Sequence, residues 1–328
     1  MMKLSPNKSL FVTGASGFVG KALLPKLLAK GFLVRALIRK HGFYTSSKID
    51  YIKINDLAEI KDLTQSLLEV DVVIHLAARV HVMSENNESP LDEYRRVNVQ
   101  QTINLARHAA NLGVKRFIFI SSAKVNGELT RVNKPFRPDD QPNPRDPYSI
   151  SKMEAEDALI RLSRETDMEI VIIRPPIIYG PGVKANFLRL IKIIDKGIPL
   201  PFGSVQNFRS MIFIDNLLDL IIRVIDHPDA AGEILLVSDD EDVSTKCLIN
   251  HLSHELGRKA RLIRFPERLL SLLFKVLGKS DIYNRLIGSF QLDIKRTKEK
   301  IGWNPPVNFE QAIKITIKSY RKEPSLNE

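Results

Sequence analysis

Short apolar runs and segments of helical length alternate through the first half of the chain. The runs are rich in Val, Ile, Leu and Phe, and segments such as 21–29 and 97–112 separate them. Buried strands that alternate with helices indicate βαβ units, and right-handed crossovers then build a parallel sheet covered on both faces. This pattern predicts an α/β fold, a doubly wound parallel sheet of the Rossmann type. The predicted strands are 10–12, 33–38, 49–54, 71–76, 117–120 and 170–173.

Pro and Gly interrupt the chain more often after Arg174, and the last third is mostly helical in pattern. A helix is predicted at 217–225 and one more strand at 233–237. We therefore expect a cofactor-binding Rossmann domain followed by a smaller, mostly helical substrate domain. The expected boundaries are 1–175 plus about 208–240 for the first domain, and about 176–207 plus 241–328 for the second.

The composition is that of an ordinary globular protein. Of the 328 residues, 44% are hydrophobic and 27% are charged, which excludes collagen-like and wholly disordered chains. The single cysteine, Cys247, excludes an internal disulfide and a Cys-rich zinc site, and the histidines lack metal-ligand spacing. No apolar run has the length of a membrane-spanning helix, and the first ten residues lack the apolar stretch of a secretory signal. We expect a cytoplasmic protein without a metal.

The net charge of +11 is concentrated near the C-terminus. From His251 onward there are 16 Lys or Arg and 8 Asp or Glu, a difference of 16 − 8 = +8. A basic region attracts nucleic acid, an anionic membrane surface or an anionic small substrate. Neither a zinc finger nor an aromatic–basic RNA motif accompanies it, so we expect no nucleic-acid partner.

The apolar segment 266–278 is interpreted as a core or interface helix. The alternative is an interfacial membrane helix with Arg264, Arg268, Lys275 and Lys279 at lipid headgroups.

A glycine-rich turn joins the first predicted strand to the first helix. Its sequence, Thr-Gly-Ala-Ser-Gly-Phe-Val-Gly at 13–20, has the spacing G-x-x-G-x-x-G. Glycines let the backbone approach a pyrophosphate, and a helix N-terminus offers free N–H groups and a partial positive charge. The candidate cofactor-binding residues of this turn are Gly14, Ser16, Gly17, Phe18, Val19 and Gly20.

The second strand ends in Ile38 and Arg39, whereas NAD-binding folds usually have Asp or Glu there to bind the ribose 2′-hydroxyl. Arg39 could accept a 2′-phosphate, which favours NADP over NAD.

After the third strand, Asp56 and Leu57 are expected to flank the adenine ring. His75 ends the fourth strand, and we interpret it as a packed histidine rather than a base.

A serine, a tyrosine and a lysine follow in the order needed for carbonyl chemistry. Ser122 comes at the end of the fifth strand, and Tyr148 and Lys152 stand four residues apart on one helix face. An ammonium beside a phenol would lower the tyrosine pKa, so that the phenol could exchange a proton with a carbinol or carbonyl oxygen. The hydroxyl of Ser122 could bind the same oxygen.

Taken together, these motifs resemble the extended short-chain dehydrogenase/reductase family, in its nucleotide-sugar branch with the UDP-hexose 4-epimerases. The resemblance implies Ser122, Tyr148 and Lys152 as the catalytic residues and Asn98 as a support near the tyrosine. It also implies cofactor contacts from Leu76, Ala77, Ala78, Asn98, Tyr148, Lys152, Pro175 and Ile178, and diphosphate contacts from Asn186 and Arg209. The matching segments are 13–20, Asp56-Leu57, 75–78, Asn98, Ser121-Ser122, 148–152, 174–181, 209–215 and 302–306.

This sequence departs from the epimerase pattern in three motifs. An acid is missing at Ile38, Asn126 replaces a Tyr, and Pro-Pro-Ile follows Arg174 in place of Tyr-Phe-Asn. The segments Ser-Ser-Ala-Lys-Val-Asn-Gly and Gly-Val-Lys-Ala-Asn-Phe are similar to a bacterial surface-polysaccharide subgroup. That subgroup includes 4-ketoreductases forming UDP-N-acetylquinovosamine.

The resemblance therefore implies an NADPH-dependent reduction of the C4 keto group of a UDP-4-keto-6-deoxy-N-acetylhexosamine. The alternative is a UDP-hexose or UDP-N-acetylhexosamine 4-epimerase with tightly bound NAD. A dehydratase is disfavoured, because Ala123 and Lys124 stand where that reaction needs an acid/base pair. A non-catalytic NADP-binding sensor or scaffold is the alternative of another class. The family often dimerises through a helix pair, for which 97–112 and 148–162 are the candidates.

Overall fold

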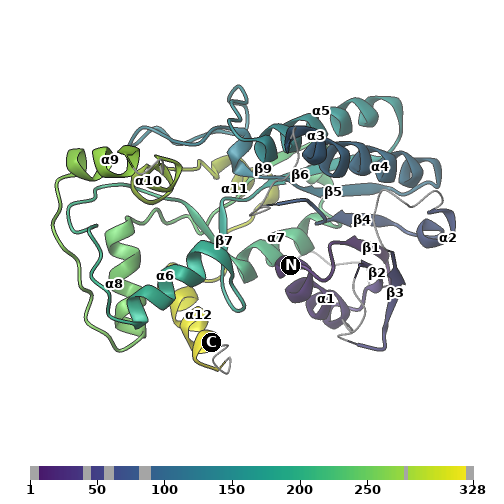
Figure 1. The fold of residues 1–328 in the computed structure, drawn as a ribbon. Coiled ribbons are helices and arrows are strands. Elements are labelled where there is room, and N and C mark those ends of the chain that lie inside the picture. Colours follow the sequence, from purple (N-terminus) through teal and green to yellow (C-terminus); the bar gives the residue numbers. More distant parts are fainter. Residues whose placement is uncertain (1–6, 40–45, 55–62, 81–89, 277–279, 323–328) are drawn as a thin grey trace.

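The computed structural model describes residues 7–39, 46–54, 63–80, 90–276 and 280–322. Asp56 and Leu57, expected at the adenine, lie outside the described residues. The chain forms one large parallel sheet with helices on both faces and a second group of helices at one end (Figure 1).

The large sheet confirms the predicted doubly wound architecture. Its seven strands are all parallel, and the order reverses direction at β1, between β2 and β4. In sheet order the strands are β3 (Ile49–Lys53), β2 (Leu33–Ile38), β1 (Ser9–Thr13), β4 (Val72–His75), β5 (Arg116–Ile120), β6 (Glu169–Arg174) and β9 (Ile234–Leu236).

Alternate residues of the central strands supply two separate apolar layers. Leu10 and Val12 of β1 belong to the layer that includes α1 (Phe18–Ala29) and α7 (Ile214–Val224). Phe11, between them, belongs to the opposite layer, because successive strand side chains point to opposite faces. That layer contains α2 (Thr64–Leu67), α4 (Gln101–Asn111) and α5 (Pro147–Glu165).

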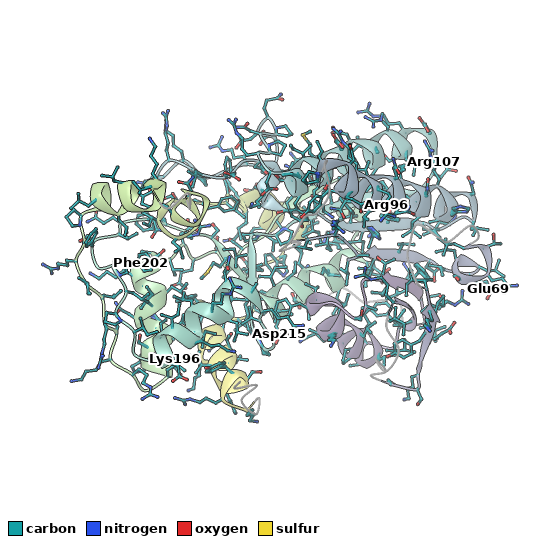
Figure 2. All side chains as sticks on the ribbon, in the orientation of Figure 1. Glu69, Arg96, Arg107, Lys196, Phe202 and Asp215 are labelled. Carbon is teal, nitrogen blue, oxygen red and sulfur yellow. The ribbon has the colours of Figure 1, made fainter. Side chains whose placement is uncertain are left out.

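Helices α1 and α7 lie side by side on one face of the sheet, and α4 and α5 on the other (Figure 1). An ion pair of 3.2 Å between Lys26 and Asp215 joins α1 to α7 near their exposed surface, where Figure 2 labels Asp215. On the other face, α3 (Pro90–Arg95) and a π-helix, η2 (Arg96–Gln100), precede α4. The predicted helix 97–112 is therefore a π turn followed by an α-helix.

Residues after Arg174 build the second group of elements and return once to the large sheet. The two-stranded parallel sheet of β7 (Ile177–Tyr179) and β8 (Met211–Phe213) was not predicted from the sequence. β9 then pairs with β6, which confirms the strand expected at 233–237. The remaining helices are α6 (Ala185–Asp195), α8 (Thr245–Glu255), α9 (Glu267–Val276), α10 (Ser280–Ile287), α11 (Lys295–Ile301) and α12 (Phe309–Lys322).

A buried carboxylate connects the small sheet to the large one. Asp239, which follows β9, accepts hydrogen bonds from the Phe213 amide (2.8 Å), the Asn216 side chain (2.7 Å) and the Tyr179 hydroxyl (2.8 Å). Burial raises the pKa of Asp239 to about 6. These bonds fix β7, β8 and α7 against the end of β9.

Among the described helices, none combines the length and the apolar character needed to cross a bilayer.

Candidate active site

The glycine-rich turn lies directly against the end of β4. Gly14 has φ +66°, a conformation that favours glycine, and a Cβ there would lie 2.7 Å from the Ala77 nitrogen. A Cβ at Gly20 would lie 2.4 Å from the Gly14 carbonyl oxygen. Glycine at position 14 therefore allows the turn to pack against Leu76 and Ala77, and glycine at position 20 allows α1 to pack against the turn itself.

The N-terminus of α1 can bind an anion. Its N-cap is Gly17, which has no side chain to cap the helix, and the first turn contains no acid. The first N–H groups of a helix have no partner within the helix and carry a partial positive charge. A pyrophosphate fits this position, since no side chain of the helix itself competes for these donors.

At the end of β2 the structure places the two residues that stand where an acid is usual. Ile38 is buried with 2% exposure, and Arg39 is exposed. The register pairs Val12 with Ala36, so Arg39 lies at the same edge of the sheet as the glycine-rich turn.

His75 is a structural residue, as its strand-end position suggested. Its Nδ1 lies 2.7 Å from the Thr13 hydroxyl and its Nε2 lies 3.0 Å from the Thr102 hydroxyl. The Thr102 hydroxyl donates to the Asn98 carbonyl, so we assign the ring proton to Nε2. Burial, and then the charge of Lys152, lower the His75 pKa to about 3, which keeps the ring neutral.

Ser122 lies where β5 ends and is half-buried. It caps a short 3-10 turn, Ala123–Val125, by accepting a hydrogen bond of 3.2 Å from the Lys124 amide. This bond uses a lone pair and leaves the hydroxyl hydrogen to be donated to another oxygen. Such a group can polarise a carbonyl.

Tyr148 stands in the first turn of α5. A capping box between Asp146 and Ser149, with Pro147 at the helix start, fixes this helix end. The ring packs edge-on against Tyr94, with centroids 6.4 Å apart. Burial, and then the Asp146 charge, raise the pKa of Tyr148 above its ordinary value. The expected lowering of this pKa is therefore wrong for the structure, because burial and a carboxylate act on the phenol.

Lys152 is fully buried one turn further along α5. Its ammonium lies 3.8 Å from the centroid of the Phe119 ring, and the described residues give it no ion pair within hydrogen-bond distance. Burial lowers the Lys152 pKa to about 7, while the charge of Glu156 acts in the opposite direction. The ammonium packs on the face of the Phe119 ring, and Lys152 is not among the groups that shift the Tyr148 pKa.

Asn98 connects three parts of the site. It lies in η2, whose first residue, Arg96, is labelled in Figure 2. Its side chain donates to the Ser151 hydroxyl (3.0 Å) and the Arg79 carbonyl (3.1 Å), and accepts from the Arg79 amide (2.8 Å). The Ser151 hydroxyl in turn donates to the Tyr148 carbonyl at 2.7 Å. Asn98 therefore holds the backbone of Tyr148 and the segment after β4, as a support for the tyrosine would.

A buried ion pair that the sequence did not predict joins helix α5 to strand β6. Arg174, at the end of β6, pairs with Glu156 of α5 at 2.5 Å, and both side chains are at most 3% exposed. Arg174 also donates to the Asn126 side chain at 3.0 Å, and Asn126 donates to the Arg137 carbonyl at 2.7 Å. The Pro175 carbonyl accepts from the Ala123 amide at 2.9 Å. The position of Glu156, one turn after Lys152, was the available signal.

The two residues expected at the substrate diphosphate lie in different surroundings. Arg209 donates to the Gly288 carbonyl at 2.7 Å and lies over the Phe290 ring at 5.8 Å. Burial lowers its pKa to about 10, and no ion pair involves it in the described part of the chain. A desolvated guanidinium without a carboxylate can bind an anion. Asn186 is exposed in the first turn of α6, and no contact joins it to Arg209.

Comparison with known proteins adds a family to this geometry. Residues 10–238 match the model of the NAD dependent epimerase/dehydratase family. The chain is 45% identical over 315 residues to a UDP-glucose 4-epimerase of Vibrio cholerae, with 95% of each covered. It is 30% identical to an N-acetyl-alpha-D-glucosaminyl-diphospho-ditrans,octacis-undecaprenol 4-epimerase of Escherichia coli O157:H7, with 95% of each covered.

Solved structures share the fold. The UDP-glucuronic acid 4-epimerase of Bacillus cereus in complex with NAD superposes with a TM-score of 0.78 at 22% identity, covering 95% of this chain and 98% of that one. The UDP-glucose 4-epimerase of Thermotoga maritima with UDP-glucose gives 0.78 at 22% identity, covering 96% and 99%. With the matched segment including the glycine-rich turn, Ser122, Tyr148 and Lys152, the chain belongs to the NAD dependent epimerase/dehydratase family and is an enzyme of the short-chain dehydrogenase/reductase type.

Proposed function

We propose that this enzyme is an NADPH-dependent 4-ketoreductase of a nucleotide sugar. The proposed substrate is a UDP-4-keto-6-deoxy-N-acetylhexosamine, a precursor of a surface polysaccharide. The observation that carries the proposal is the end of β2, where buried Ile38 and exposed Arg39 stand in place of an acid. A 2′-hydroxyl finds no carboxylate from β2 there, whereas a 2′-phosphate finds a guanidinium.

The cofactor-binding residues in this proposal follow the carboxyl edge of the sheet. The free N–H groups at the start of α1 would bind the pyrophosphate, and Leu76–Ala78 would line the adjacent edge. Lys152 would bind the nicotinamide ribose, and Pro175 and Ile178 would lie near the ring. NADPH, when bound, supplies a hydride to the substrate C4.

Tyr148 and Ser122 would complete the reduction. The Ser122 hydroxyl donates a hydrogen bond to the C4 carbonyl oxygen, and Tyr148 donates the proton that turns the nascent alkoxide into an alcohol. Burial raises the Tyr148 pKa, so the phenol is protonated before the reaction, as a proton donor must be. An epimerase begins in the opposite sense, by removing a proton from the C4 hydroxyl.

Arg209 and Asn186 would bind the substrate diphosphate. Arg209 brings a half-buried positive charge with a planar donor set suited to two phosphate oxygens. Asn186 is exposed and would contact the substrate from α6.

The second candidate is a 4-epimerase with retained NAD. It is favoured by the 45% identity to a protein named UDP-glucose 4-epimerase. The fold shared with a UDP-glucuronic acid 4-epimerase solved in complex with NAD also favours it. Such an enzyme oxidises C4, turns the keto sugar and reduces it again, so it consumes no cofactor.

A cofactor comparison separates the two candidates. The purified enzyme is given the UDP-4-keto sugar with NADPH or NADH, and UDP-glucose and UDP-N-acetylglucosamine without added cofactor. We expect stoichiometric loss of NADPH and slower use of NADH. Interconversion of the two C4 epimers of a UDP-sugar, with no cofactor consumed, would replace the reductase by the epimerase.

The variant Arg39→Ser tests the assignment of Arg39. We expect kcat/KM for NADPH to fall roughly 10- to 100-fold, the worth of a charge-assisted hydrogen bond, with NADH unaffected. Arg107→Ser is the matched control, because Arg107 is an exposed arginine on α4, distant from β2 (Figure 2). Equal losses in the two variants, or none in either, would contradict the role of Arg39.

A further inference from the structure

Helix α9 presents an apolar stripe to solvent. Leu269, Leu272 and Val276 are 53%, 58% and 77% exposed, and their spacing puts them on one face of the helix. Leu270 is 1% exposed and packs inward. Ile263, just before the helix, is 52% exposed. Large apolar side chains gathered on one outward face mark an interaction surface.

The surroundings of this stripe are strongly basic. Between Gly257 and Lys279 the sequence contains seven Lys or Arg and one acid, Glu267. Arg264 and Lys275, next in sequence to Ile263 and Val276, are exposed. Nearby in the sequence, Arg258 forms an ion pair of 3.3 Å with Asp195. A second copy of this chain would bring like charges together, whereas an anionic surface would neutralise them.

The length of α9 decides how it would meet a bilayer. Its ten residues extend about 15 Å at the ordinary rise of a helix, half of the hydrocarbon thickness. A short helix with an apolar face and basic flanks lies in the plane of the interface, with its apolar side chains among the acyl chains.

We propose that α9 and the basic segment 257–265 form a membrane-docking surface that binds bilayers containing anionic lipids. Lys275 and Arg264 contact lipid headgroups, and Leu269, Leu272 and Val276 enter the interface. In Figure 1, α9 and α10 lie at the end of the molecule opposite to β3. Docking there places the bilayer at the end of the molecule away from β3. It also places the Gly288 carbonyl, which follows α10 and binds Arg209, near the membrane.

Vesicle co-sedimentation of the whole purified chain tests this surface. Vesicles of phosphatidylcholine alone are compared with vesicles that also contain phosphatidylglycerol, at low and high NaCl. We expect binding to the anionic vesicles that weakens as salt screens the charges. Failure to bind anionic vesicles at low salt would overturn the proposal, and so would equal binding to both vesicle types.

Matched variants assign the binding to α9. Leu272→Ser is expected to reduce the bound fraction by roughly three- to tenfold. Leu33→Ser is the control, because Leu33 is also 58% exposed but lies at the start of β2. Lys275→Ala is expected to reduce the bound fraction about fivefold. Lys314→Ala, which changes an exposed lysine on α12, is expected to reduce it much less.

The remaining outcomes are decisive too. A loss of binding in Leu33→Ser equal to that in Leu272→Ser would show non-specific adsorption and reject the proposal. A dimer that Leu272→Ser dissociates, observed by sedimentation without lipid binding, would assign the stripe to self-association instead. Turnover of the UDP-sugar should be unchanged in Leu272→Ser, and thermal unfolding confirms that each variant is folded.

Discussion

Lys152 on α5 and Asp239 after β9 are both ionisable side chains removed from water, in two regions with different surroundings. Asp239 accepts hydrogen bonds from Phe213, Asn216 and Tyr179, so the chain itself completes its environment. The Lys152 ammonium contacts the face of Phe119. A buried polar group that its own protein satisfies has a structural role, and one left without a hydrogen-bonding partner is available to a ligand.

The same contrast occurs within helix α5. Glu156, one turn after Lys152, is buried against Arg174 in a bidentate pair, and Arg174 is also bound to Asn126. This pair fixes α5 against β6 and the turn that follows Ser122. The helix thus combines a satisfied ion pair that positions it with a buried lysine to which the described residues give no ion pair.

The largest expected effect is on activity, and it distinguishes the region of Tyr148 and Lys152 from the region of Asp239. Tyr148→Phe removes the proposed proton donor and should lower kcat by roughly 10²- to 10⁴-fold, with thermal unfolding and cofactor binding unchanged. Tyr179→Phe is the control, because it removes a buried hydroxyl from the Asp239 region. That variant should lose stability, by about 1–3 kcal/mol, and keep its kcat. Full activity of Tyr148→Phe would contradict the assignment of Tyr148 as the proton donor.

The second prediction concerns the ion pair of α5. Glu156→Gln leaves the buried guanidinium of Arg174 without its countercharge, and the free energy of unfolding should fall by about 3–5 kcal/mol. The control is Glu154→Gln, whose partner Arg95 is exposed to solvent and whose loss should destabilise the protein much less. Denaturant unfolding measures both. Similar costs for the two variants would mean that burial does not distinguish the pairs.

The third prediction uses the raised pKa of Asp239. Because its folded pKa of about 6 lies above the value of 3.8 for an unperturbed carboxyl, the protonated form favours the folded state. Its contribution is fully present below about pH 4 and is lost as the pH rises through 6, a change on the order of 3 kcal/mol.

The pH dependence of His75 has the opposite sign. Its pKa is lowered from 6.5 to about 3, so its contribution is lost as the pH falls through that window. The difference in unfolding free energy between the wild-type protein and Asp239→Asn, measured from pH 4 to 7, cancels the His75 contribution. A difference that does not change with pH would contradict the raised Asp239 pKa.

The smallest predicted effect tests the connection from Asn98 to Tyr148. Ser151→Ala removes one hydrogen bond to Asn98 and should lower kcat roughly two- to tenfold, with the pH profile of kcat unchanged in shape. Ser163→Ala is the matched control on the same helix, since Ser163 also donates to the carbonyl three residues earlier but does not contact Asn98. If both variants keep full kcat, Asn98 does not position the tyrosine through Ser151.

The sequence by itself determined the large sheet and the order of the motifs along its edge. Strand periodicity, the glycine spacing at 13–20 and the four-residue separation of Tyr148 and Lys152 are local properties, written in neighbouring residues. The parallel strands then require that Ser122, His75 and the glycine-rich turn lie at one edge, since the strands that precede them all end there.

Only the tertiary structure decided how the side chains of this edge interact. Glu156 and Arg174 meet across 18 residues, β7 pairs with β8 from segments more than thirty residues apart, and Asn98 reaches Ser151 from a π turn. The direction of the Tyr148 pKa likewise depends on burial and on which charge lies nearest. Such contacts are set by packing between distant segments, and desolvation depends on that packing rather than on spacing in the sequence.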